Sequence, residues 1–156
     1  MIQLKRVLFP TDFSDFSRYA ATFAVSFSHD HGAKLFVLHV IEPSILDELH
    51  VLSVTTQVLE EKSRQLAQEE LESATDADVL EKLEYEIVCR KGTPFLEIIR
   101  FTRENAIDMV VMGTHGRSAL ESALLGSTAE KVVRKSPCPV LTIRKPGYRF
   151  VIPAVG

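Results

Sequence analysis

The chain has 156 residues, a length typical of one domain with its own hydrophobic core. Hydrophobic residues make up 46% of it and charged residues 25%, which are ordinary globular values and exclude a disordered or fibrous chain. The formal net charge is −3, and Lys and Arg are scattered along the chain, so neither nucleic acid nor an anionic membrane is expected as a partner. Only two cysteines, no long apolar stretch and no export signal together predict a protein of the reducing cytoplasm.

Apolar runs and amphipathic segments alternate in the first part of the chain. Residues 6–10 and 35–41 are nearly continuous apolar runs, which predict strands buried on both faces. Between them, apolar residues at helical spacing predict a helix that starts near Ser14 and is capped by Gly32. His39, inside the second run, is expected to be a core histidine with satisfied polar atoms.

The rest of the chain repeats this alternation. Residues 42–52 predict a long irregular connection, and residues 56–73 predict a largely solvated helix on the outside of a sheet. Residues 83–89 alternate apolar and polar side chains, as in a strand with one wetter face at a sheet edge. The remaining predicted elements are a helix that opens with Thr93 and Pro94, a strand at 107–113, a helix at 127–136 and a strand at 139–144.

This order of elements predicts one α/β domain. Strands and helices alternate without a break in composition, so a single doubly wound parallel sheet with helices on both faces explains the chain better than two domains. We assign residues 1–146 to the domain and residues 147–156 to a C-terminal tail.

A set of glycines marks the candidate site, because ligands of open parallel sheets bind outside the carboxyl ends of the strands. The strand at 107–113 runs directly into Gly113 and Gly116, and Gly126 precedes the last helix. The spacing is Gly, two residues, Gly, nine residues, Gly-Ser. Glycines at these points let main-chain N–H groups approach an anion and adopt the positive φ angles that turn them toward it.

The start of the last helix adds a second feature suited to phosphate. Ser127 is predicted as the N-cap, and Glu130, three residues on, has the spacing of a capping box. The helix would then present free N–H groups and the positive end of its dipole to a phosphate. Thr128 adds a hydroxyl donor, and His115 and Arg117 can supply positive charge.

Other features narrow the choice of ligand. Asp12, which follows the first strand, can accept hydrogen bonds from ribose hydroxyls or help to hold a divalent cation. The P-loop motif G-x-x-x-x-G-K-[ST] and the dinucleotide motif G-x-G-x-x-G are both absent from the sequence. The same glycines also suit ordinary loop and cap geometry, so a loop without a ligand stays open as the alternative.

Six segments of the chain resemble the universal stress protein family. They are Pro10 to Ser14, Leu38 to Val40, Lys91 to Pro94, Met112 to Arg117, Gly126 to Ala129 and Ser136 to Leu141. The resemblance covers nearly the whole chain and implies a five-stranded parallel sheet in the order 3-2-1-4-5. It also implies a homodimer, and the glycine spacing resembles the subgroup of the family that binds ATP.

Carried over position by position, the resemblance implies an adenine-nucleotide site. ATP is the implied cofactor, with magnesium or manganese as an optional companion ion whose protein ligands are unknown. Pro10, Thr11 and Asp12 would line the site from the first strand, Val40 and Val88 would flank adenine, Met112 and Gly113 would lie near the base and ribose, and Gly116, Arg117, Gly126, Ser127 and Thr128 would hold the phosphates.

The sequence favours binding over catalysis. An enzyme needs a nucleophile or a base beside the phosphates, and only Asp12, His115 and the hydroxyls of Ser127 and Thr128 are available. We therefore expect an ATP-binding, nucleotide-dependent regulator of a stress response. Two alternatives stay open: a slow ATP hydrolase, and a dimeric interaction module that does not need nucleotide. In the dimer, the last strand, Val140 to Ile143, is expected to pair with its symmetry mate.

Overall fold

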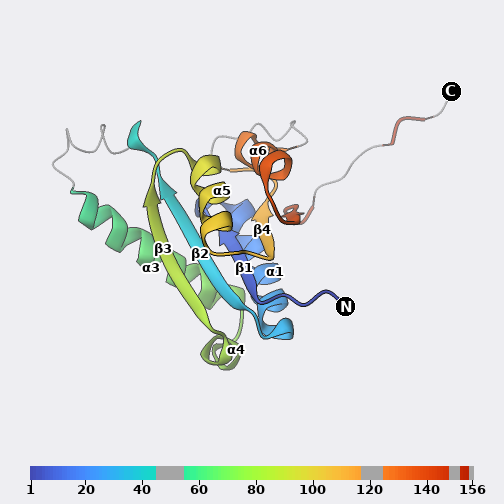
Figure 1. The fold of residues 1–156 in the computed structure, drawn as a ribbon, viewed down its shortest axis with the longest axis horizontal. Coiled ribbons are helices and arrows are strands. Elements are labelled where there is room, and N and C mark those ends of the chain that lie inside the picture. The colour runs from blue at the N-terminus through green and yellow to red at the C-terminus, as the bar shows by residue number, and fades with distance from the viewer. Residues whose placement is uncertain (45–54, 117–124, 148–151, 155–156) are drawn as a thin grey trace.

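The computed structural model describes residues 1–44, 55–116, 125–147 and 152–154. Within these residues, five parallel strands form one sheet with helices on both faces (Figure 1). The strands are β1 (Arg6–Pro10), β2 (Lys34–Ile41), β3 (Tyr85–Lys91), β4 (Met109–Gly113) and β5 (Val140–Ile143), in the spatial order β3-β2-β1-β4-β5. The predicted doubly wound α/β fold and its strand order are confirmed.

Helices cover the two faces of this sheet. Packed on one face are α1 (Asp15–His31) and α3 (Thr56–Ala74), with the short α4 (Ala77–Lys82) next to α3. Packed on the other face are α5 (Pro94–Glu104) and α6 (Ser127–Lys135). The chain leaves β1 toward one face and β4 toward the other, so a crevice opens between these two strand ends. α4 was not predicted, because six residues are too few to show a helical period.

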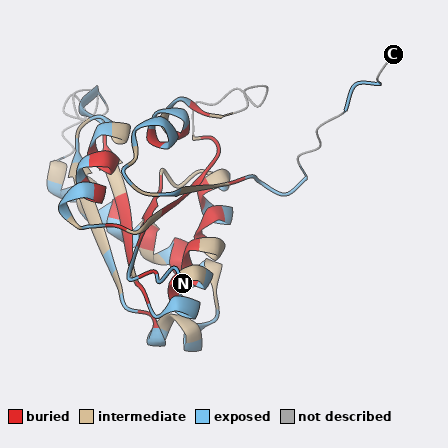
Figure 2. Cartoon of the chain, turned by 45° about the vertical axis from the view of Figure 1, so that its right-hand side comes forward, coloured by how far each residue is buried: buried red, intermediate tan, exposed pale blue. Residues whose placement is uncertain are grey.

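The strands supply side chains to two hydrophobic cores, one on each face of the sheet. In β1, Val7 and Phe9 enter the core that contains α1 and α3, whereas Leu8 enters the core that contains α5 and α6. All three side chains are fully buried. Burial on both faces is the reason these strands read as continuous apolar runs. Figure 2 shows the buried residues gathered along the central strands and on the helix faces turned toward them.

Both ends of α1 form as the sequence predicts. The Ser14 hydroxyl accepts a hydrogen bond from the Ser17 N–H at 3.3 Å and caps the first turn. Gly32 ends the helix in the left-handed region with a φ of 62°, a conformation that side chains with a Cβ rarely adopt. The helix therefore begins directly after the strand-end turn at residues 11–14, which is part of the site described below.

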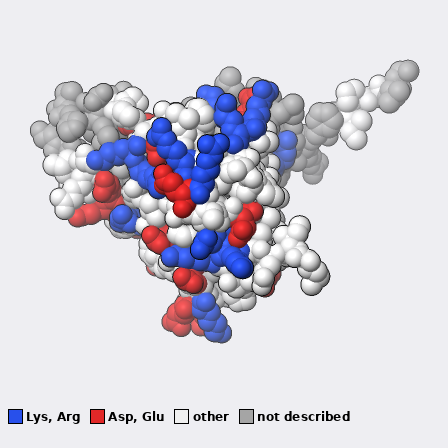
Figure 3. Space-filling view, viewed as in Figure 1, with Lys and Arg blue, Asp and Glu red and all other residues white. Residues whose placement is uncertain are grey.

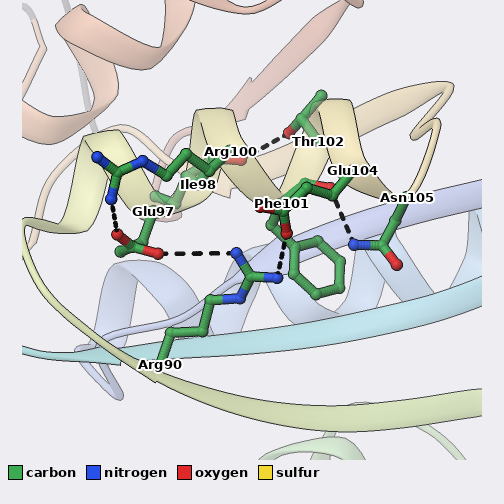
Figure 4. A network of polar contacts seen from close by, with 8 residues as sticks. All are labelled: Arg90, Glu97, Ile98, Arg100, Phe101, Thr102, Glu104 and Asn105. Atoms are coloured by element: carbon green, nitrogen blue, oxygen red, sulfur yellow. Dashed lines mark hydrogen bonds and ion pairs between the residues drawn. The ribbon is translucent and has the colours of Figure 1, made fainter.

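β3 lies at the edge of the sheet, as its alternating sequence predicted, and it starts at Tyr85 because Leu83 still forms the C-cap of α4. Arg90 joins this edge to α5 (Figure 4). Its guanidinium group lies 3.7 Å from the Glu97 carboxylate, 2.5 Å from the Glu104 carboxylate and 4.8 Å from the centroid of the Phe101 ring. These contacts hold α5 against the edge strand β3.

Some predictions fall on residues outside the described ranges. These are most of the connection at 42–52, Arg117, and most of the tail at 147–156. Among the helices in the described ranges, none has both the length and the apolar content needed to cross a membrane.

Candidate functional site

The carboxyl ends of β1, β2 and β4 surround a pocket of about 600 Å³, a size typical of small-molecule sites. One side of α3 and the first turn of α6 complete its walls. The lining residues are Pro10, Thr11, Asp12 and Phe13 at and after the end of β1; Ser17 on α1; Leu38, His39, Val40, Ile41 and Glu42 on and after β2; Leu59, Lys62, Ser63 and Leu66 on α3; Pro94 and Ile98 on α5; Met112, Gly113, His115 and Gly116 on and after β4; and Leu125, Gly126, Ser127, Thr128 and Ala129 at α6.

The structure brings most of the predicted site residues together around this one pocket. Those that line it are Pro10, Thr11, Asp12, Val40, Met112, Gly113, His115, Gly116, Gly126, Ser127 and Thr128. They come from four separate stretches of sequence, and the fold places them at one end of the sheet because the strands are parallel.

Val88 does not line this pocket. It pairs with Leu38 in the sheet, whereas the β3 residue level with Val40 is Arg90. Val88 therefore lies three residues before the end of β3, and it lines a second, more open hollow on the sheet surface. Arg90 does not line this pocket either, and its side chain lies over the Phe101 ring. The role of Val88 beside adenine stays a prediction.

The second hollow, of about 840 Å³, has mainly charged walls. Figure 3 shows Lys and Arg interleaved with Asp and Glu on this face of the molecule. The charges pair with one another: the Lys34 ammonium lies 2.9 Å from the Glu86 carboxylate, and Arg90 pairs with Glu97 and Glu104. Because Lys34 and Arg90 already pair with carboxylates, neither is available to a charged ligand in this hollow.

The turn after β1 holds Asp12 in a fixed orientation. Its Oδ1 atom accepts hydrogen bonds from the Ser14 N–H at 3.0 Å and from the Ser17 hydroxyl at 2.8 Å. Phe13, the next residue, adopts a φ of 64°, which is uncommon for a side chain of this size. Its ring packs against the His39 ring with centroids 4.5 Å apart and planes tilted by 32°. The turn is thus a rigid wall of the pocket with a carboxylate at its edge.

A Cβ at any of the three glycines of the motif would crowd a neighbouring residue. A Cβ at Gly113 would lie 2.9 Å from the Phe16 carbonyl carbon, and one at Gly116 would lie 2.5 Å from Asp12 Oδ2. A Cβ at Gly126 would lie 3.1 Å from the His115 Cα. The expected positive φ angles are wrong, since none of the three has one. Close approach of neighbouring chain segments, rather than backbone conformation, accounts for glycine here.

The start of α6 differs from the prediction by one residue. Gly126 is the N-cap and Ser127 the first helical residue, because the Gly126 N–H donates to the Thr114 carbonyl at 2.7 Å and fixes the turn there. The predicted capping box of Ser127 and Glu130 is therefore wrong; the Glu130 N–H donates to the Gly126 carbonyl at 2.9 Å. Among the described residues, no side chain forms a cap hydrogen bond at the start of α6. The first N–H groups of a helix have no partner within the helix, and a ligand or solvent can satisfy them.

His115 forms part of the wall between β4 and α1. Its ring is buried and packs against Phe16 with centroids 5.2 Å apart, and its Nδ1 lies 2.9 Å from the Thr114 hydroxyl. The supply of positive charge by His115 stays a prediction, as does that by Arg117, which lies outside the described residues.

Sequence reasoning missed the side of the pocket formed by α3. Leu59 and Leu66 read as the sparse apolar stripe of a solvated helix, yet both line the pocket, together with Lys62 and Ser63 between them. The sequence shows that these residues share one face of a helix, but it does not show that this face lies against the pocket. His39 was likewise predicted as a core residue with satisfied polar atoms. Its Nδ1 donates to the Thr11 carbonyl at 2.8 Å, as that prediction requires. The ring is only half-buried, however, and it also lines the pocket.

A buried carboxyl group on α3 lies directly behind the pocket wall. Glu70 is only 7% exposed, and its Oε2 accepts a hydrogen bond from the Thr11 hydroxyl at 2.7 Å. Burial raises the pKa of the Glu70 carboxyl to about 7; the Thr11 hydrogen bond and the Arg18 charge lower it, and the Asp12 charge raises it. Because α3 reads as a solvated helix, nothing in its sequence singles out Glu70.

Metal ligation has little support in the described part of the chain. No three of its His, Cys, Asp or Glu side chains gather closely enough to hold an ion. His29 and His31 lie in the last turn of α1, at the end opposite the pocket, and His29 hydrogen-bonds the neighbouring Asp30 carboxylate.

Comparison with known proteins agrees with this architecture. A sequence model of the Universal stress protein family matches residues 3–144. The chain is 32% identical over 145 residues to universal stress protein MJ0531 of Methanocaldococcus jannaschii, and the alignment covers 91% of this chain and 83% of that protein. The solved structure of MJ0577 from the same organism superimposes with a TM-score of 0.79 at 25% identity, covering 94% of this chain and 100% of that one.

Two more distant structures share the fold and contain nucleotides. One is a universal stress protein in complex with cAMP, with a TM-score of 0.62 and 23% identity over 92% of this chain and 98% of that one. The other is the universal stress protein of Archaeoglobus fulgidus in complex with dAMP, with a TM-score of 0.58 and 20% identity over 91% of this chain and 98% of that one. The match over nearly its whole length shows that the present chain belongs to the universal stress protein family.

Proposed function

We propose that this protein binds ATP in the pocket at the carboxyl end of its sheet and acts as a nucleotide-dependent regulator in a stress response. The observation that carries the proposal is the first turn of α6, which lines the pocket and has no side-chain cap among the described residues. Uncapped N–H groups and the positive end of a helix dipole bind phosphate well.

The phosphates are assigned to the side of the pocket formed by α6 and the end of β4. Ser127 and Thr128 lie in the first turn of α6 and offer hydroxyl donors beside its N–H groups. Gly116 lies next to them and presents backbone without a side chain. In this arrangement the chain neutralises phosphate charge mainly with backbone dipoles, which suits a pocket whose described walls include only one Lys, Lys62.

The nucleoside is assigned to the opposite side of the pocket. Val40, Met112 and Ile98 offer apolar surface for a base, and Asp12 is held at the edge, where a ribose hydroxyl can donate to it. Adenine nucleotides in two proteins of the same fold, cAMP in one and dAMP in the other, support this choice of ligand class. Magnesium or manganese would be held through the phosphates.

We favour regulation over catalysis because two candidate bases among the described residues are engaged in the wall of the pocket. The Asp12 carboxylate already accepts two hydrogen bonds from the turn, and the His115 ring is buried against Phe16. A slow ATP hydrolase is the second candidate, and release of phosphate from bound ATP would favour it. We also propose a cytoplasmic homodimer, in which the last strand, Val140 to Ile143, pairs with its symmetry mate. In support, β5 lies at the outer edge of the sheet and its first three residues are partly exposed.

Thermal melting with different ligands tests this proposal. ATP at about 100 times its Kd is expected to stabilise the protein by about 2.7 kcal/mol, which corresponds to roughly 5–10 °C for a domain of this size. Adenosine and inorganic tripolyphosphate each engage one side of the pocket and should raise the melting temperature less. An unchanged melting temperature in excess ATP would contradict the proposal and favour the interaction module that needs no nucleotide.

A further inference from the structure

We infer that the buried Glu70 carboxyl, which accepts a hydrogen bond from Thr11 behind the pocket wall, makes nucleotide affinity depend on pH through its change of charge. This inference rests on the proposed function, because it concerns regulation of the same pocket. Glu70 itself does not line the pocket; it lies one hydrogen bond behind the wall.

Thr11 connects Glu70 to the pocket wall. While its hydroxyl donates to Glu70 Oε2 at 2.7 Å, the same oxygen accepts from the Phe13 N–H at 3.0 Å. The Thr11 carbonyl accepts from His39 Nδ1 at 2.8 Å. Thr11 therefore connects the turn that carries Asp12 to β2 through its carbonyl and to Glu70 through its hydroxyl.

The second oxygen of Glu70 is unusual. Oε1 is buried and has no hydrogen-bond partner among the described residues. A buried ionised carboxylate with one unpartnered oxygen is costly, and a fold seldom keeps one without a use. A proton on Oε1 removes the charge while Oε2 still accepts from Thr11. Protonation thus changes the charge behind the pocket without breaking the bond that holds the turn.

The groups around Glu70 come from several elements. Arg18 on α1 attracts the ionised form, and Asp12 in the strand-end turn repels it. His39 on β2 lies on the far side of Thr11, and Tyr85 on β3 donates to a different side chain of α3. Burial outweighs these influences and raises the pKa of Glu70 to about 7, so the carboxyl changes charge near neutral pH.

The sign of the effect follows from the charge of the ligand. An ionised Glu70 adds a second negative charge beside Asp12 and opposes the phosphates, and a bound nucleotide also removes water from the wall. Both effects raise the pKa of Glu70 further when ATP binds, so the complex takes up a proton. A rise of half to one pKa unit corresponds to an affinity about three- to tenfold higher below about pH 6 than above about pH 8.

Calorimetric titration with ATP over this pH range tests the inference in wild-type protein, Glu70→Gln and Glu69→Gln. Glu69 is exposed on the same helix, so its variant is a matched control that should keep the full pH dependence. Glu70→Gln keeps an acceptor for Thr11 and should show only the pH dependence due to ionisation of ATP itself. Adenosine, which carries no phosphate, should bind with little dependence on pH.

The outcomes separate this inference from the proposed function. Tight ATP binding with the same pH profile in wild type and Glu70→Gln would overturn the inference and leave the proposed function intact. No ATP binding at any pH would overturn both. The carboxyl carbon of Glu70, followed by NMR in the unmodified protein, gives an independent readout: its titration midpoint should rise when ATP is added, and an unmoved midpoint would contradict the coupling.

Discussion

Gly113→Val is expected to destabilise the protein by about 3 kcal/mol, because it forces a side chain into a space already filled by α1. The Cβ of any substituted residue would lie 2.9 Å from the Phe16 carbonyl carbon and 3.0 Å from its oxygen. These are backbone atoms within a helix, which cannot rotate away as the end of a side chain can. For a domain of this size the loss corresponds to a melting temperature lower by roughly 6–12 °C.

Thermal and urea denaturation of Gly113→Ala and Gly113→Val measure this effect. The alanine variant introduces the same contact with less bulk, so a graded loss, smaller for Ala than for Val, is expected. A valine variant that melts within about 2 °C of wild type would show that α1 does not pack on β4 in the manner described. Because the change acts on the fold, a loss of nucleotide affinity in these variants would say little about the site.

Gly116→Val is expected to lower ATP affinity about 10- to 100-fold with a much smaller loss of stability. A Cβ there would lie 2.5 Å from Asp12 Oδ2, a contact with the end of a side chain at the edge of the pocket. Asp12 can only yield by weakening its hydrogen bonds to Ser14 and Ser17, and the added methyl groups narrow the pocket beside α6.

The measurement is a titration with ATP, alongside Gly147→Ala as the control. Gly147 has a φ of 91° and no atom within 4 Å of a substituted Cβ, so alanine there strains the backbone without touching the pocket. The control should lose some stability and keep its affinity for ATP. Equal affinity of Gly116→Val and wild type would remove Gly116 and Asp12 from the binding site.

Much of the fold could be predicted because burial leaves a direct mark on sequence. The run at 6–10 is apolar at successive positions since Val7 and Leu8 enter different cores, and that pattern is typical of a central parallel strand. The spatial order of the strands has no such mark; it was implied only by the family resemblance. α4 has too few residues to show a helical period in the sequence. Because its C-cap is Leu83, β3 begins at Tyr85 and not at residue 83.

The candidate site was predictable where its residues follow strand ends, and less so where it depends on packing. The glycine spacing located the pocket, but whether Gly116 provides conformational freedom or room for Asp12 depends on the three-dimensional approach of two turns. The N-cap moved from Ser127 to Gly126 because of a hydrogen bond to Thr114, a residue distant in sequence. The burial of Glu70 likewise requires knowing which side of α3 meets the β1 turn.

Calorimetric titration of nucleotide-free protein with ATP, ADP and AMP, each with and without magnesium, tests the central claim most directly. The account predicts saturable binding of ATP at one site per chain, with a Kd in the micromolar range or tighter, and weaker binding as phosphates are removed and the contacts to α6 are lost. No detectable heat, together with an unchanged melting temperature in excess ATP, would contradict it and reduce the glycine motif to a structural loop.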